Sequence, residues 1–287
     1  MSDLLSLFDE LDKVADEPKI LKPPFGYPGG KSKSIKHILP NLPYRNTYVE
    51  PFGGSAAVIL SRHKSNLEVF NDRYAGVVAF YRCIRSKDKT DALIERLEQT
   101  LFAREEWVWC YNTWLHCSDD VERAARWYYM HVYSFGQIGR NFGRATKSKG
   151  TPAGKIFNRL PEFHDLHLRF RNTQVENLDW YKCLLDYDSP ETVFYLDPPY
   201  LDSHKGAYKH EMSLPHHEKL LTTIFELDGF VAISSYSNPL YNNQPWDNVI
   251  SWETNVTLDP MGDIQGNRKE GIVVDRAKAT EMLYIKE

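Results

Sequence analysis

The sequence has few of the features that mark secreted, membrane-bound or metal-binding proteins. It contains four cysteines, none in a CxxC pair, so neither a disulfide framework nor a paired thiolate site is indicated. Cys110, His116 and Cys117 lie close together, but no second pair completes a metal site. No apolar run approaches the roughly 20 residues of a membrane span, and the acidic first ten residues are not a secretory signal. We therefore expect a cytoplasmic chain with reduced thiols, no metal and no membrane segment.

The chain also lacks an excess of positive charge. Its 287 residues carry a net charge of −4, with 42% hydrophobic and 26% charged residues. This composition is globular and suits one large domain or two small ones. A nucleic-acid-binding protein of this net charge would need a local basic patch.

One segment provides such a patch. Residues 136–160 contain six basic residues, five glycines and no acid. Such a segment suits a phosphate backbone, and arginine and asparagine side chains can also read guanine and adenine edges. The alternative is a solvated flexible loop. The residues that we expect to contact nucleic acid are Arg140, Asn141, Arg144, Lys147 and Lys149.

A tetrapeptide after a short apolar run is the most informative motif. Residues 193–196 are expected to form a buried strand, and Asp197, Pro198, Pro199 and Tyr200 follow it. The two prolines stiffen the backbone and leave only carbonyl acceptors, while an ionised aspartate is also an acceptor. Together they can accept both hydrogens of a nucleobase amino group, and the tyrosine ring can stack on the base. The alternative is an ordinary Pro-Pro loop.

A glycine-rich turn lies between two further predicted strands. A strand over 47–49 leads into Glu50-Pro51-Phe52-Gly53-Gly54-Ser55, an apolar helix is expected over 56–62, and a strand over 67–70 ends near Asp72. In nucleoside-binding βαβ units an acid about 20 residues after the glycine turn bonds ribose hydroxyls. The full GxGxxG pattern is absent, so a dinucleotide is not favoured. Gly29-Gly30-Lys31, ahead of another predicted helix, suits a carboxylate or phosphate.

Periodicity predicts the remaining elements. Helices are expected at residues 32–39, 91–99, 105–116, 120–133 and 215–227, strands at 230–234 and 280–285, and a loop-rich stretch at 240–270. The central tryptophans are expected to fill a small core: Trp107, Trp109, Trp114 and Trp127. Residues 3–15 have the apolar spacing of a helix that either packs on its own domain or docks a partner.

Taken in order, these motifs resemble those of the Dam-like DNA adenine-N6 methyltransferases of the alpha group, which use S-adenosylmethionine. The resemblance spans roughly residues 20–82 and 176–287. The segments that carry it are Tyr27-Pro28-Gly29-Gly30-Lys31, Glu50-Pro51-Phe52-Gly53-Gly54-Ser55, Asn71-Asp72, Leu178-Asp179-Trp180, Asp197-Pro198-Pro199-Tyr200 and Arg276-Ala277-Lys278-Ala279-Thr280-Glu281.

The resemblance implies an α/β fold, with a Rossmann-like methyltransferase sheet over 20–82 and 176–287. It also implies a mainly helical target-recognition domain inserted over 83–175, after an extension over 1–19. The catalytic residues would be Asp197, Pro198, Pro199 and Tyr200. The S-adenosylmethionine contacts would be Tyr27, Lys31, Glu50, Phe52, Gly53, Gly54, Asp72, Asp179 and Asp197.

The resemblance also implies partners and a setting. The substrate would be double-stranded DNA, with a cognate restriction endonuclease as a further candidate partner. The chain would be a monomer or weak dimer at the nucleoid of a bacterial or phage-infected cell. Three alternatives stay open: methylation of another planar amine such as RNA adenine or protein glutamine, methylation of cytosine N4, and a non-catalytic DNA-binding regulator on the same scaffold.

Overall fold

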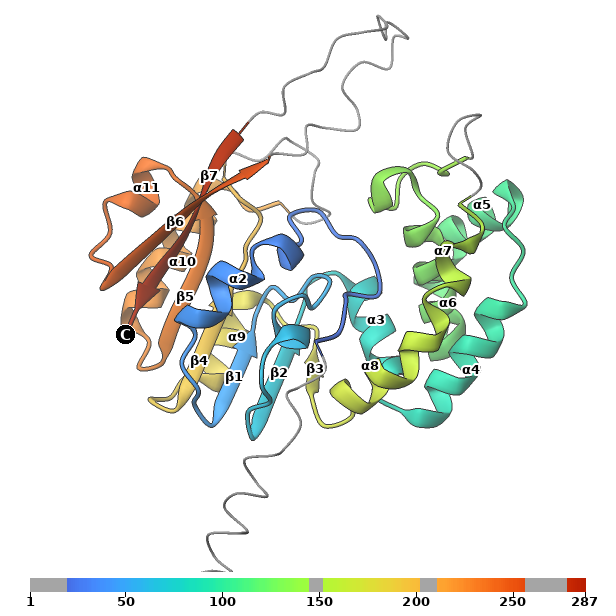
Figure 1. Ribbon diagram of the computed structural model, residues 1–287, viewed down its shortest axis with the longest axis horizontal. Helices are drawn as coiled ribbons and strands as arrows, with labels where there is room; N and C mark the ends of the chain where they lie inside the picture. The colour runs from blue at the N-terminus through green and yellow to red at the C-terminus, as the bar shows by residue number, and fades with distance from the viewer. Residues whose placement is uncertain (1–19, 145–151, 202–210, 256–277) are drawn as a thin grey trace, which may run out of the picture.

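The computed structural model describes residues 20–144, 152–201, 211–255 and 278–287. The predicted N-terminal helix, Lys147, Lys149 and the segment 276–277 lie outside these ranges. Within them the chain forms a seven-stranded sheet in the order β3-β2-β1-β4-β5-β7-β6 (Figure 1). The strands are β1 (Thr47–Glu50), β2 (Leu67–Asn71), β3 (Gln174–Glu176), β4 (Thr192–Leu196), β5 (Phe230–Tyr236), β6 (Asn248–Asn255) and β7 (Lys278–Lys286).

The order of the strands reverses between β1 and β4, and the binding site is expected at the carboxyl ends of these strands. Strands β1 to β5 are parallel, and β7 runs antiparallel between β5 and β6. The chain moves outward from β1 to β3 and then returns to β4 on the other side of β1. In open α/β sheets, ligands bind outside the carboxyl ends of the strands at such a reversal. This is the Rossmann-like arrangement that the resemblance predicts.

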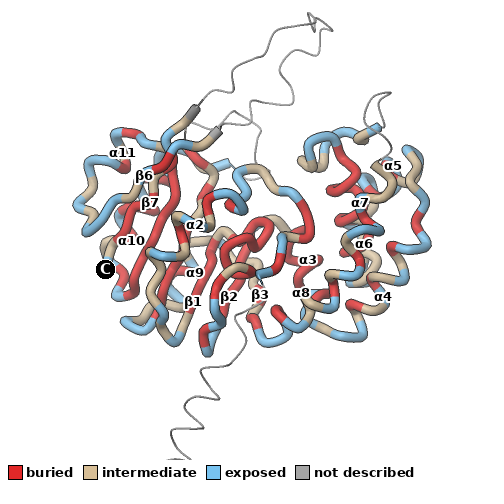
Figure 2. Tube along the Cα trace, in the orientation of Figure 1, coloured by how far each residue is buried: buried red, intermediate tan, exposed pale blue. Residues whose placement is uncertain are grey.

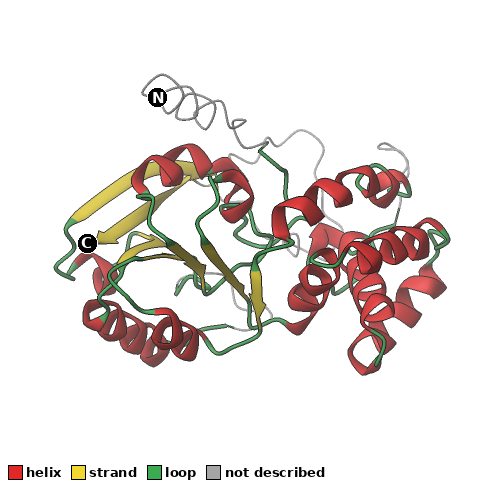
Figure 3. Cartoon of the chain, turned by 90° about the horizontal axis from the view of Figure 1, so that it is seen from below, coloured by secondary structure: helices red, strands yellow, loops and turns green. Residues whose placement is uncertain are grey.

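Helices cover both faces of the sheet, as Figure 3 shows. Every residue of β4 is buried (Figure 2), as is typical of a parallel strand between two helical layers. Its alternate side chains join two hydrophobic clusters. One cluster includes α2 (Ile35–Ile38), α3 (Ala75–Ile84) and α8 (Phe163–Phe170), and the other includes α9 (Trp180–Tyr187), α10 (Leu214–Glu226) and α11 (Pro239–Asn242).

The segment between β2 and β3 is mainly helical and lies beside the sheet, with α3 and α8 nearest to the strands (Figure 1). Besides α3 and α8 it contains α4 (Lys87–Glu98), α5 (Arg104–Thr113), α6 (Asp120–Val132) and α7 (Gly154–Phe157). One hydrophobic cluster runs from Phe70 of β2 through Tyr81 of α3 to Trp127 of α6. The predicted domain limits, 82/83 and 175/176, fall inside α3 and β3. No helix in the described ranges is both long and apolar enough to span a bilayer.

Most predicted elements are confirmed, and three differ from the prediction. The predicted helix over 56–62 contains only a 3-10 turn, η3 (Ile59–Ser61), and Ala56 has a left-handed φ of 63° that a helix cannot start from. The predicted loop over 240–270 contains β6, which pairs along its whole length with β7. The helix over 32–39 is broken into η1 (Lys31–Lys33), α2 and η2 (Leu39–Asn41).

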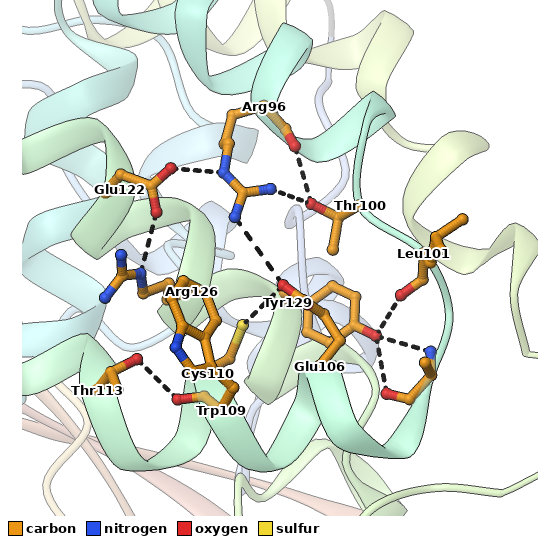
Figure 4. Close-up of polar contacts among 11 residues, drawn as sticks. Arg96, Thr100, Leu101, Glu106, Trp109, Cys110, Thr113, Glu122, Arg126 and Tyr129 are labelled. Carbon is orange, nitrogen blue, oxygen red and sulfur yellow. Dashed lines mark hydrogen bonds and ion pairs between the residues drawn. The ribbon is translucent and has the colours of Figure 1, made fainter.

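One of the four tryptophans does not belong to the core. Three are buried as predicted: Trp107, Trp114 and Trp127. Trp109 is 41% exposed, and the guanidinium of Arg126 lies 4.0 Å from the centre of its ring. Arg126 is held there by an ion pair of 2.9 Å with Glu122 (Figure 4). A cation over the indole face therefore replaces burial at this position.

Candidate active site

A cavity of about 230 Å³ opens at the carboxyl ends of β1 and β4, where the order of the strands reverses. All the residues that sequence analysis assigns to a cofactor line it: Tyr27, Lys31, Glu50, Phe52, Gly53, Gly54, Asp72, Asp179 and Asp197. The fold thus brings together five sequence segments that are far apart in the chain. What these residues bind stays a prediction at this point.

The glycine turn after β1 shapes the floor of the cavity. The N–H of Gly53 donates to the carbonyl of Asn71 at 2.7 Å, which brings the turn against the end of β2. A Cβ at Gly53 would overlap the ring of Phe70. Gly54 has a φ of 51°, and a Cβ there would lie 3.0 Å from Cδ1 of Tyr27. Both positions therefore require glycine, and the turn can approach a ligand closely.

Asp72 is a fixed acceptor at the end of β2. Its Oδ2 accepts the N–H of Gly54 at 2.8 Å, and its Oδ1 accepts the N–H of Tyr74 at 2.7 Å. Burial raises the pKa of Asp72 to about 6, although both backbone hydrogen bonds lower it. Each carboxylate oxygen can accept more than one hydrogen bond. Asp72 can therefore still accept hydrogen bonds from hydroxyl groups of a ligand.

Glu50 lies at the end of β1 and is almost fully buried. The hydroxyl of Tyr48 donates to its Oε1 at 2.8 Å. Burial raises the pKa of Glu50 to about 8, against the lowering effect of that hydrogen bond. The side chain is consequently neutral near pH 7, and a cationic group of a ligand beside it would favour its ionisation.

Lys31 is a buried cation beside the tetrapeptide. Its Nζ lies 2.7 Å from Oδ1 of Asp197 and donates to the carbonyl of Gly29 at 2.7 Å. Burial raises the pKa of Asp197 to about 6, while Lys31 lowers it. Asp197 is therefore ionised above that pH. With Glu50 and Asp72, it makes the cavity rich in carboxyl groups.

The tetrapeptide does not present all four side chains to the cavity. Asp197 and Pro199 line it, whereas Pro198 and Tyr200 are buried behind them. The prediction that Tyr200 offers an open ring face is not matched, because its ring is 6% exposed. Its hydroxyl donates to Oε1 of Glu281 at 2.9 Å, and the ring of Tyr236 lies edge-on at 4.7 Å.

Sequence analysis missed several residues of the cavity wall. Met212, which precedes α10, His216, in the first turn of α10, and Trp180, at the start of α9, line the cavity together with Tyr195 of β4. Two local signals were present: Trp180 stands in the motif Leu178-Asp179-Trp180, and a helix begins at Leu214, soon after the tetrapeptide. In the part of the chain that the structure describes, no group of three or more His, Cys, Asp or Glu side chains is placed to hold a metal ion.

The basic segment begins beside the cavity. Gly26 donates its N–H to Oε1 of Gln137 at 2.6 Å, and its carbonyl lies 2.8 Å from Nε2 of His131. The next residue, Tyr27, lines the cavity. Gln137 lies a few residues before the predicted nucleic-acid contacts Arg140, Asn141 and Arg144, which are exposed. Lys147 and Lys149 lie outside the described residues.

Comparison with known proteins gives matches over most of the chain. The family described as D12 class N6 adenine-specific DNA methyltransferase matches residues 27–257. Modification methylase LlaI of Lactococcus lactis subsp. lactis is 32% identical over 196 residues, which are 64% of this chain and 30% of that protein. Modification methylase StsI of Streptococcus sanguinis is 30% identical over 213 residues, 68% of this chain and 31% of that protein. The matched part thus spans under a third of each relative.

Proposed function

This chain belongs to the D12 class of N6 adenine-specific DNA methyltransferases, and we propose that it transfers a methyl group from S-adenosylmethionine to N6 of an adenine flipped out of duplex DNA. One observation carries the proposal. Asp197 lies in the wall of the same cavity as Glu50, Asp72 and Asp179, so a methyl donor in the cavity would lie beside the group that holds the amine.

The residues of the cavity fit this cofactor. When bound, S-adenosylmethionine supplies an electrophilic methyl group on a sulfonium centre. Asp72 would accept hydrogen bonds from the ribose hydroxyls, since two backbone N–H groups fix its oxygens in place. Glu50 and the turn at Gly53 and Gly54 would border the methionine half, where a cationic amino group would favour the ionised glutamate. Asp179, which caps α9, would accept the adenine amino group of the cofactor.

Asp197 would hold and polarise the target amino group. The lone pair of an adenine amino group is delocalised into the ring, so this nitrogen is a weak nucleophile. Hydrogen bonds from N6 to Asp197 and to the carbonyl of Pro198 would favour a pyramidal nitrogen and stabilise the positive charge that develops there. The proton would leave only after the nitrogen has accepted the methyl group, because a neutral aryl amine is a very weak acid. Pro199 would form part of the pocket wall.

The basic segment would hold the DNA beside the cavity. Flipping a base costs about a few kcal/mol, and contacts to phosphates offset part of that cost. We propose that these contacts come from Arg140, Asn141, Arg144, Lys147 and Lys149. We also propose that the chain acts at the nucleoid of a bacterial or phage-infected cell, as a monomer or weak dimer with a cognate restriction endonuclease. Two relatives named modification methylases favour that setting.

Replacing Asp197 tests the proposed chemistry. Asp197→Ala is expected to lower the rate of methyl transfer to DNA by at least about 10²-fold, as loss of a preorganised charge partner does. DNA affinity should change little, because Asp197 would contact only the flipped base and none of the phosphates. Transfer of labelled methyl groups and DNA binding are measured in parallel. Asp228→Ala is the control. Asp228 is exposed and precedes β5, so it lies at the amino ends of the parallel strands, opposite the cavity. Near-normal transfer by Asp197→Ala would refute the role.

A further inference from the structure

A buried glutamate near the end of the chain touches the proposed catalytic group. Glu281 lies in β7, where it pairs with Tyr236 of β5 and with Trp252 of β6. It is 5% exposed and does not line the cavity. A buried carboxylate is costly unless it is paired and hydrogen-bonded, so its partners indicate what it does.

The two oxygens of Glu281 accept from three side chains. Oε1 accepts the hydroxyl of Tyr200 at 2.9 Å. Oε2 accepts the hydroxyl of Ser34 at 2.9 Å and the indole N–H of Trp252 at 3.1 Å. Oε1 also lies 3.4 Å from Nζ of Lys31. These donors come from the N-terminal segment, the tetrapeptide and the neighbouring strand, so the carboxylate is held from three directions.

Lys31 is therefore shared between two carboxylates. Its Nζ lies 2.7 Å from Asp197 and 3.4 Å from Glu281, and it sits 4.9 Å from the centre of the Tyr200 ring. With both acids ionised, this cluster carries a net charge of −1. With Glu281 neutral, Lys31 and Asp197 would form a closed neutral pair, and an incoming amino group would have to compete with the lysine for the aspartate.

We propose that Glu281 is a positioning residue of the transfer reaction, which shares Lys31 with Asp197 and fixes Tyr200 so that Asp197 keeps the orientation and the free acceptor capacity needed to hold the target amino group. This inference rests on the proposed function of Asp197. It also gives Tyr200 a role that agrees with its buried ring, because its hydroxyl joins Glu281 to the tetrapeptide.

A purely structural role for Glu281 would have a different signature. A glutamate that only joined β7 to residues 31–34 would affect stability, but its charge would not act on Asp197. Among the described residues, the titratable and charged groups that face the cluster are Lys31, Glu50, Tyr195, Asp197, Tyr200, Tyr236 and Glu281. The negative charge of Glu281 raises the pKa of Asp197. Removing that charge should lower the pKa of Asp197.

The test is Glu281→Gln in the full chain, with the rate of methyl transfer to DNA measured against pH at saturating S-adenosylmethionine. The rate at the plateau should fall by about 10- to 100-fold, by analogy with the loss of an outer-shell partner that orients a metal ligand. The acid limb of the profile should move to lower pH. Ser34→Ala removes a donor to the same carboxylate without changing its charge, so its acid limb should stay in place. Glu281→Asp keeps the charge and should retain the wild-type limb even if Glu281→Gln folds poorly.

Two results would overturn the inference. One is a Glu281→Gln profile identical to that of the wild type. The other is a slower rate with an unshifted acid limb, which would indicate a structural role. The affinity for S-adenosylmethionine against pH gives a readout without turnover, because Lys31 and Asp197 line the cavity. If the wild type transfers no methyl group, the proposed function fails, whereas an unchanged pH dependence of this affinity in Glu281→Gln defeats the inference alone.

Discussion

At the scale of single residues, the glycine turn decides whether the cavity can form. Gly53→Ala places a methyl group inside the ring of Phe70, which is itself packed between Tyr81 and Phe170 and has little room to move. We expect the variant to lose about 1–3 kcal/mol of unfolding free energy and most of its affinity for S-adenosylmethionine. Denaturant titration and calorimetry measure the two quantities.

Gly154→Ala is the matched control for that substitution. The added Cβ would lie 3.6 Å from the side chain of Asn158, an ordinary contact at the first turn of α7. This variant should bind and unfold like the wild type. Equal cofactor affinity in the Gly53 and Gly154 variants would contradict the close approach of the turn to the ligand.

Glu50 gives a stability prediction with a definite sign. Its pKa is raised from 4.5 to about 8 in the folded chain, so the folded state binds the proton more tightly than the unfolded state. The resulting stability is fully present below the unfolded pKa and is lost as the pH rises to about 8. Glutamine cannot ionise, so the Tm of Glu50→Gln does not fall for this reason. The difference between its Tm and that of the wild type should therefore increase in favour of the variant from about pH 5 to about pH 8.

Thermal unfolding without cofactor measures this difference, and Glu191→Gln, which is exposed, controls for the loss of one negative charge. A gap between Glu50→Gln and the wild type that stays constant with pH would show that Glu50 is not a buried, proton-binding group.

The positions of some residues in and around the cavity could be predicted from the sequence, and those of others could not. Asp72 and Asp197 follow strands whose apolar runs are evident, so their place at the ends of strands could be read from the sequence. Glu281 and Met212 could not be placed, because their approach to the site depends on the pairing of β7 with β5 and on the return of the chain to α10. No local pattern encodes those contacts.

At the scale of elements, periodicity identified most of the long helices and missed those that are short or largely buried. Helices α4, α6 and α10 repeat apolar residues every three or four positions. Their predicted ends lie within a few residues of the observed ends. Helix α3 was missed because seven of its ten residues are buried. Helices α8 and α9 were missed because each has only eight residues, too few to establish the repeat. The predicted helix after the glycine turn failed because Ala56 takes up a left-handed conformation to close the turn.

The segment between α6 and α7 gives a prediction for DNA binding. Arg140→Ala with Arg144→Ala should weaken DNA affinity and reduce the slope of log affinity against log salt by roughly 0.9 for each phosphate that the variant no longer neutralises. The rate of transfer at saturating DNA should change little. Arg171→Ala is the control. Arg171 is exposed and precedes β3, so it lies at the amino ends of the parallel strands, opposite the cavity. A slope equal to that of the wild type in the double variant would exclude this segment from the DNA interface.

At the scale of the whole molecule, the reversal of strand order makes the site. It brings residues 27–31, 50–54, 72, 179 and 197 to one edge of the sheet, although they are spread over most of the chain. The helical segment is joined to that edge through Gly26, which contacts both His131 and Gln137. A basic segment thus starts beside a cavity rich in acids, and the two charges suit a polyanionic DNA and a cationic cofactor.

The most direct test of the account is the identity of the methylated nucleoside. DNA is incubated with the purified chain and S-adenosylmethionine, digested to nucleosides and analysed by mass spectrometry, with RNA and protein as parallel acceptors. We expect N6-methyladenine in DNA with the wild type and none with Asp197→Ala. Methylation at cytosine N4, transfer to RNA or protein alone, or cofactor binding without any methylated base would contradict it.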